Sequence, residues 1–139
     1  MIRGTGIEFI ALQDMQRWDE EDVRRQIWTP GELDSCKTKR LSKHRLAARY
    51  AAKKAILSAM GIQGAEDAVE VPLTDIEIRQ SPSGTPYPVL RGTAAARAGH
   101  LHIARWHLSL THTERYAAAF ALAEGEDGEN VQKSGSEGG

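Results

Sequence analysis

Three cations lie close together in residues 41–61, LSKHRLAARYAAKKAILSAMG. Most of these residues favour helix, and Gly61 predicts where the helix stops. Arg49 and Lys53 are one helical turn apart and Lys54 lies beside them, so a helix would display them as a basic patch. Such a patch is either a solvated face or an anion site, because clustered lysine and arginine side chains hold phosphate groups in proteins.

Two predicted strands carry further polar candidates. Glu8 lies in the apolar run 2–10, where glycines at positions 4 and 6 indicate that a backbone or a ligand comes close. This acid either faces solvent at a sheet edge or points into a site. Residues 103–112 alternate, so a strand would place Trp, Leu and Leu on one face. The opposite face, which is either solvated or functional, would carry Arg105, His107, Ser109 and Thr111.

The remaining pattern predicts the elements that position these residues. Helices are expected over 14–27, over 30–36 and over 93–99. The second of them has Thr29 as N-cap, Pro30 at its first position and Glu32 completing a capping box. Strands over 73–79 and 87–90 would form a hairpin across the turn at 81–86, and 116–123 reads as a strand of small residues.

The composition indicates one domain of 139 residues with a modest core, over residues 1–124, followed by a disordered tail over 125–139. A net charge of −1 argues against a bulk nucleic-acid binder. No run of about 18 apolar residues predicts a membrane span, and the N-terminus lacks the form of a secretory signal. Cys36 is the single cysteine, which excludes an internal disulfide. These features predict a soluble, cytoplasmic protein.

Five stretches, taken in chain order, resemble the motifs of the holo-acyl-carrier-protein synthases, the small trimeric members of the 4′-phosphopantetheinyl transferase superfamily. The resemblance spans about residues 1–124. The matching stretches are 4–8 (GTGIE), 28–34 (WTPGELD), 48–55 (ARYAAKKA), 83–87 (SGTPY) and 107–119 (HLSLTHTERYAAA).

The resemblance implies an α+β fold in which an antiparallel sheet packs on a long helix. It also implies a homotrimer with active sites at the subunit interfaces. Coenzyme A would be the donor and a serine of an acyl carrier protein the acceptor. In the family, Mg²⁺ bridges a strand carboxylate, a helix carboxylate and the donor pyrophosphate. A metal suits this reaction because phosphoryl transfer depends mostly on positioning and charge stabilisation.

The sequence departs from the family pattern where the chemistry takes place. Glu8 stands where the family has Asp, and Lys54 stands where it has the helix Glu. A cation cannot ligate Mg²⁺, which binds oxygen donors, so Lys54 puts the metal in doubt. Positions that are basic in the family are here Asp14, Ser58 and Thr85.

Two outcomes follow from Lys54. In the first, it pairs with Glu8 and its ammonium partly replaces Mg²⁺, while coenzyme A binds to the basic helix residues. In the second, transferase chemistry is lost. The scaffold then serves a metal-independent acid–base reaction on a carrier-bound acyl chain, with Glu8, Lys54 or His107 as candidates, or it only binds a carrier protein.

Whole-chain similarity favours phosphopantetheinyl transfer as the function. The candidate catalytic residues are Glu8, Asp34, Lys54 and His107, with Asp34 or His107 expected near the acceptor hydroxyl. Glu8 is the candidate metal ligand. The candidate residues for binding coenzyme A are Arg49, Lys53, Ser109 and Thr111.

Overall fold

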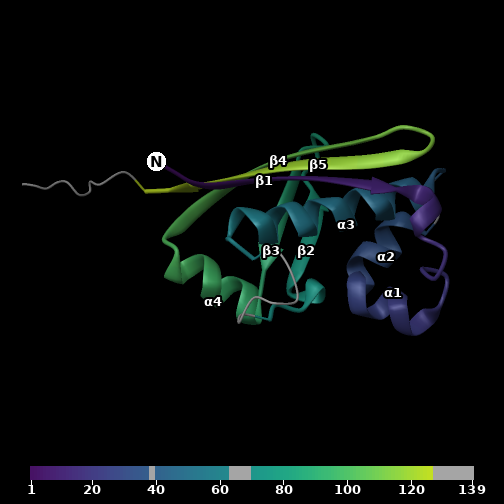
Figure 1. Ribbon diagram of the computed structural model, residues 1–139, viewed down its shortest axis with the longest axis horizontal. Coiled ribbons are helices and arrows are strands. Elements are labelled where there is room, and N and C mark those ends of the chain that lie inside the picture. The colour runs from purple at the N-terminus through teal and green to yellow at the C-terminus, as the bar shows by residue number, and fades with distance from the viewer. Residues whose placement is uncertain (38–39, 63–69, 127–139) are drawn as a thin grey trace, which may run out of the picture.

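The computed structural model describes residues 1–37, 40–62 and 70–126 (Figure 1). Its fold is α+β with antiparallel strand pairing, as predicted. The strands are β1 (Ile2–Ala11), β2 (Ile76–Gln80), β3 (Pro86–Leu90), β4 (Ile103–His112) and β5 (Tyr116–Gly125). The α-helices are α1 (Glu21–Ile27), α2 (Pro30–Cys36), α3 (Ser42–Ala59) and α4 (Gly92–His100), and the 3-10 helices are η1 (Leu12–Asp14) and η2 (Leu73–Asp75).

A three-stranded sheet in the order β1-β5-β4 runs along one side of the molecule, and α3 lies against it (Figure 1). The central strand β5 turns only small side chains toward the helix, and α3 is itself rich in buried alanine. Small residues on both surfaces let the helix and the sheet approach closely. The alanines of β5 on this side are Ala117, Ala119, Ala121 and Ala123, all buried.

The faces of β4 agree with the predicted alternation. Trp106, Leu108 and Leu110 pack against the core. The residues between them are exposed on the opposite face of the sheet, which no helix of the described chain covers (Figure 1). One side of this sheet is therefore core and the other is surface.

The predicted hairpin is present as β2 and β3, joined through a turn in which Gly84 has φ +89°. Only a residue without a side chain adopts this conformation readily. Helix α4 follows directly, and Asp75 accepts a hydrogen bond of 2.8 Å from the backbone N–H of Thr93 in its first turn. The predicted extended start of β2 is wrong, because residues 73–75 form η2 instead.

The capping box at the start of α2 is present as predicted, with Thr29 and Glu32 exchanging hydrogen bonds. Helix α3 ends at Ala59, and Gly61 follows with φ +81°, which is typical of a glycine that terminates a helix. The described helices include none that is long and apolar enough to cross a membrane.

The helix predicted over 14–27 is wrong in its first half, because α1 begins only at Glu21. The indole ring of Trp18 packs edge-on against Trp28 and Tyr50, with ring centroids 5.0 and 4.7 Å apart. The apolar spacing that predicted a helix here therefore comes from a turn residue, Trp18, whose side chain packs into the core. At the other end of the chain, β5 extends to Gly125, two residues past the predicted strand and into the first residue of the predicted tail. Residues 63–71 are polar and contain a glycine, which predicts a loop; residues 63–69 of this stretch, and residues 127–139 of the predicted tail, lie outside the described residues.

Candidate active site

The contact between β1 and α3 determines the geometry of the site. A Cβ atom at Gly6 would lie 2.0 Å from the backbone oxygen of Ala55, and one at Gly4 would lie 2.0 Å from that of Ala59. The two glycines therefore let the strand backbone rest directly on the helix backbone. This confirms the close approach expected from the glycine spacing in residues 2–10.

Glu8 continues the helix-facing side of β1, because alternate residues of a strand share a face. It is half-buried, and it lies one strand repeat beyond the contact of Gly6 with Ala55. Lys54 is the residue before Ala55 and is also half-buried. The strand acid and the helix cation therefore lie on adjoining parts of the β1–α3 contact.

The ion pair between these two residues, which is one of the two outcomes that the sequence leaves open, is not formed. In residues 1–37, 40–62 and 70–126, neither a salt bridge within 4.0 Å nor a hydrogen bond joins Glu8 to Lys54. The Lys54 ammonium has no hydrogen-bond or ion-pair partner anywhere in this described part of the chain. Its hydrogen-bonding capacity is therefore unused by the described residues.

Lys53 has a different environment, although it is the adjacent residue. Its side chain is fully buried, with its Nζ 2.7 Å from Glu32 Oε1, and it donates to the carbonyl oxygens of Ile27 and Leu73. Burial lowers the pKa of the Lys53 ammonium, against the opposing effect of Glu32. All of its donors are directed at the interior, so the geometry gives Lys53 a structural role and provides no access to a phosphate.

Glu32 has a second role in this buried cluster that the sequence did not indicate. Besides capping α2, its Oε2 accepts a 2.8 Å hydrogen bond from the backbone N–H of Ile78 in β2. The capping-box motif was readable in the sequence, but nothing in that motif indicates a partner in a distant strand.

Arg49 is likewise buried, on the side of α3 that faces α2 and β2. Its Nε donates to the carbonyl oxygen of Ile78 at 3.4 Å, and a terminal nitrogen donates to the Ser35 hydroxyl at 3.3 Å. The three helix cations therefore do not form one exposed patch. Arg49 and Lys53 point into the α2–β2 contact, and Lys54 alone lies on the β1 flank.

The outward face of β4 carries the second group of candidates. His107, Ser109 and Thr111 are exposed there. His107 Nε2 lies 2.9 Å from Glu124 Oε1 on β5, and this hydrogen bond, helped by the charge of Arg105, holds the pKa of Glu124 below its ordinary value. This face lies on the other side of the sheet from α3, so a single chain does not bring it together with Lys54.

Asp34, the other candidate near the acceptor hydroxyl, is exposed on α2. Its Oδ1 lies 3.0 Å from the Lys37 ammonium. One chain therefore places the two predicted acceptor-side residues, Asp34 and His107, on opposite sides of the sheet, with α2 on the helical side (Figure 1).

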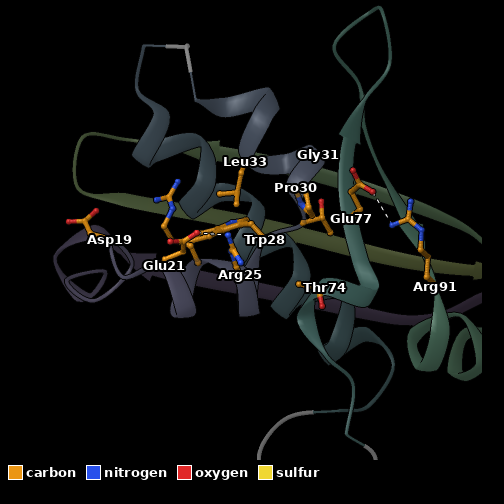
Figure 2. Close-up of a pocket in the computed structure, with 12 residues that line it drawn as sticks. Asp19, Glu21, Arg25, Trp28, Pro30, Gly31, Leu33, Thr74, Glu77 and Arg91 are labelled. Atoms are coloured by element: carbon orange, nitrogen blue, oxygen red, sulfur yellow. Dashed lines mark hydrogen bonds and ion pairs between the residues drawn. The ribbon is translucent and has the colours of Figure 1, made fainter.

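A separate concavity of about 1030 Å³ lies between α1, α2 and the start of the hairpin (Figure 2). Glu77 forms part of its wall, and its Oε1 accepts hydrogen bonds from Arg79 at 3.3 Å and Arg91 at 3.0 Å. Burial acts to raise the pKa of Glu77, but the two guanidinium groups outweigh it and the pKa lies below the ordinary value. No residue of the predicted site lines this concavity. Its lining is Asp19, Glu21, Arg24, Arg25, Trp28, Thr29, Pro30, Gly31, Leu33, Thr74, Glu77 and Arg91.

The residues at the β1–α3 contact do not fit a bound Mg²⁺. Among the described residues there is no group of three or more His, Cys, Asp or Glu side chains placed to hold a metal ion. Glu8 offers one carboxylate, but the helix position that would supply the second is the unpartnered Lys54. Its ammonium donates hydrogen bonds and repels a divalent cation.

The chain is similar over nearly its whole length to proteins of one named activity. It is 39% identical over 128 residues to a holo-acyl-carrier-protein synthase of Koribacter versatilis, covering 89% of this chain and 99% of that protein. Its structure superposes on the Neisseria meningitidis holo-acyl-carrier-protein synthase with a TM-score of 0.77 at 28% identity, over 89% of this chain and 99% of that one.

A second solved structure carries a ligand. The Bacillus anthracis holo-acyl-carrier-protein synthase, in complex with coenzyme A (3′,5′-ADP), gives a TM-score of 0.73 at 26% identity, over 91% of this chain and 99% of that one. No protein-family model matches the sequence.

Proposed function

This chain belongs to the holo-acyl-carrier-protein synthase family, and we propose that it transfers 4′-phosphopantetheine from coenzyme A to a serine of an acyl carrier protein. The match to a synthase at 39% identity over 99% of that relative is the observation that carries the proposal. In this reaction the serine oxygen bonds to the phosphorus next to the pantetheine arm. The bond from that phosphorus to the bridging oxygen breaks, 3′,5′-ADP leaves with that oxygen, and the serine proton passes to a base. The donor is a common metabolic cofactor, which fits a cytoplasmic enzyme.

The candidate residues divide between two surfaces in this proposal. Lys54 on α3 and Glu8 on β1 are assigned to the reacting phosphates, and the carboxylate of Glu8 would balance the charge of the lysine. Ser109 and Thr111 offer hydroxyl groups from the outward face of β4, and His107 is the preferred base because an imidazole nitrogen can accept a proton. Lys53 is left out of the phosphate-binding set, since its donors are satisfied within the core.

A homotrimer is part of the proposal because one chain holds these two groups on opposite sides of its sheet. The outward face of the sheet also exposes large apolar side chains, which favours contact with another copy. On this face Ile7 is 66%, Phe9 71%, Tyr116 51% and Phe120 40% exposed. In the proposed trimer each chain would turn this outward face toward a neighbouring copy, so that the β4 residues of one chain meet the α3 flank of the next.

The test is intact-mass analysis of an apo-acyl-carrier protein incubated with this protein and coenzyme A. A gain of one phosphopantetheine on the carrier is expected, together with release of 3′,5′-ADP. A parallel reaction with an established transferase shows that the carrier is competent. If the carrier gains mass only in that parallel reaction, and does so with several carriers, transfer is excluded and the alternatives of acid–base chemistry or carrier binding take its place.

A further inference from the structure

Lys54 is a half-buried cation that the described part of the protein leaves without a hydrogen-bond or ion-pair partner. The two buried cations of the same helix, by contrast, have partners. Lys53 is neutralised by Glu32, and Arg49 is hydrogen-bonded to Ile78 and Ser35. A partly desolvated ammonium with three unused donors binds an anion more strongly than a fully hydrated one, because the surrounding dielectric is lower.

The local charge supports the same conclusion. Two carboxylates and one Mg²⁺, the arrangement that the family resemblance implies, carry a net charge of zero. Glu8 and Lys54 also sum to zero, without any ion. Adding Mg²⁺ here would raise the sum to +2 and place a divalent cation beside an ammonium. The exchange of a carboxylate for a lysine therefore leaves the local charge balanced without the metal and removes one of its ligands.

The backbone contact keeps Lys54 in this position. Because Gly6 lies directly against the backbone of Ala55, the helix flank that carries Lys54 cannot move away from β1 without breaking a close-packed contact. Glu8 lies on the helix-facing side of the adjoining strand and forms no ion pair with Lys54, so the ammonium stays available for a ligand.

We propose that the Lys54 ammonium binds the pyrophosphate of coenzyme A directly, in the place that a divalent ion takes in the family, and that coenzyme A binding here requires no metal. The inference rests on the proposed transferase function and specifies how the donor is held. An ammonium offers charge-assisted hydrogen bonds to phosphate oxygens, which are among the stronger contacts available to a protein.

The experiment is isothermal titration calorimetry with coenzyme A and with 3′,5′-ADP, in EDTA and again in excess Mg²⁺. The unaltered protein is expected to bind coenzyme A with the same affinity in both buffers. Lys54→Met and Lys54→Glu should each weaken binding in EDTA by about tenfold or more, since each removes a charged hydrogen-bond donor. Lys54→Arg should retain most of the affinity.

Lys43→Glu is the matched control. Lys43 is exposed and lies eleven residues before Lys54, which is close to three helical turns, so it occupies the same side of α3 at a distance. The Lys43→Glu substitution changes the net charge as much as Lys54→Glu does. Thermal melts of every variant establish that each is folded before titration.

The outcomes separate the inference from the function on which it rests. If the unaltered protein binds coenzyme A in Mg²⁺ but loses most of this affinity in EDTA, the inference is overturned and the transferase function is retained. The inference is also overturned if the Lys54→Met variant binds coenzyme A as tightly as the unaltered protein. The same holds if Lys43→Glu weakens binding as much as Lys54→Glu does. If coenzyme A does not bind in either buffer, the proposed function and this inference are both rejected.

Discussion

Lys53 and Glu32 form a buried ion pair that joins three elements, because Glu32 caps α2 and also accepts from β2 while Lys53 comes from α3. Removing one partner of such a pair leaves a buried charge uncompensated. We expect Lys53→Met to lower the free energy of unfolding by about 3–5 kcal/mol. Chemical denaturation monitored by circular dichroism measures this.

A double-mutant cycle checks that the loss comes from the pair. Glu32→Gln combined with Lys53→Met should be less destabilising than the sum of the two single changes, because neither charge is then left alone. Additive effects would contradict the pair. A Lys53→Met protein of unchanged stability that no longer binds coenzyme A would instead return Lys53 to the phosphate-binding set.

Glu77 makes the stability of the folded protein depend on pH in the acidic range. Its pKa is lower in the folded protein than the ordinary value of 4.5, so folding favours its charged form. The stability that it contributes is present above its unfolded pKa and is lost as the pH falls through the folded pKa. Glu77→Gln should therefore be less stable than the unaltered protein at pH 7, with the gap between their melting temperatures closing as the pH is lowered below about 4.5.

Melting temperatures of the unaltered protein and of each variant, measured across this acidic pH range, show whether the pH dependence of stability comes from Glu77 or from another acid. Glu8 is a suitable comparison, because the described structure gives it no salt bridge. A gap between the unaltered protein and Glu77→Gln that stays constant with pH would show that Arg79 and Arg91 do not shift the pKa of Glu77.

At the scale of elements, the contact of β1 with α3 decides whether Glu8 and Lys54 share a site. Gly6→Ala would place a Cβ atom 2.0 Å from a backbone oxygen, which no rotamer change relieves. We expect it to destabilise the protein by about 3 kcal/mol through overpacking, and to weaken coenzyme A binding because the strand must move off the helix. Denaturation and calorimetry measure the two effects.

Gly99→Ala is the control for this change. Gly99 lies in α4, and nothing comes within 4 Å of a Cβ built there. Alanine is the better helix former, so this variant should be unchanged or more stable by up to about 1 kcal/mol. Equal stability of Gly6→Ala and Gly99→Ala would contradict the close contact.

Patterns that depend on local backbone geometry were predictable at this scale. The alternation of β4 follows directly from strand geometry, and the capping box of Thr29 and Glu32 is a local motif, so both are confirmed. The close approach at Gly4 and Gly6 was also indicated by residue type alone. Each of these features is decided within a few residues of sequence.

Features that depend on a distant partner were not predictable. Helical spacing places Arg49 and Lys53 on one side of α3, but it does not indicate that α2 and β2 cover that side. The late start of α1 also depends on distant partners, since Trp18 packs on Trp28 and Tyr50 and residues 16–19 form turns instead of helix. The position of Lys54 relative to Glu8 also required the structure, because the sequence does not show whether the two pair.

At the scale of the whole molecule, the sheet separates the two halves of the proposed site. Lys54 and Glu8 lie on its helical side, while His107 and Ser109 lie on its outward face. A monomer that kept this arrangement could not present both halves to one coenzyme A molecule. The proposed function therefore requires assembly, and the outward face, with its exposed apolar side chains, is the surface that we propose for it.

Phe120 and Phe9 are the residues that test this dependence. Phe120 stands opposite Ile7 in the β1–β5 register, and Phe9 lies two residues farther along β1, so together they form an apolar strip on the outward face. We expect Phe120→Glu to convert a trimer into monomers, because a carboxylate buried at the subunit contact would be unpaired. Sedimentation velocity measures the assembly, and calorimetry should show coenzyme A binding lost with it.

Leu41→Glu is the control, since Leu41 is also exposed, at 51%, but lies at the start of α3 away from the sheet face. It adds the same charge, and an acid near a helix N-terminus does not destabilise the helix. Leu41→Glu should keep the assembly and the affinity of the unaltered protein. A Phe120→Glu monomer that still binds coenzyme A normally would show that one chain holds the donor by itself, and the β4 residues would then have to be withdrawn from the site.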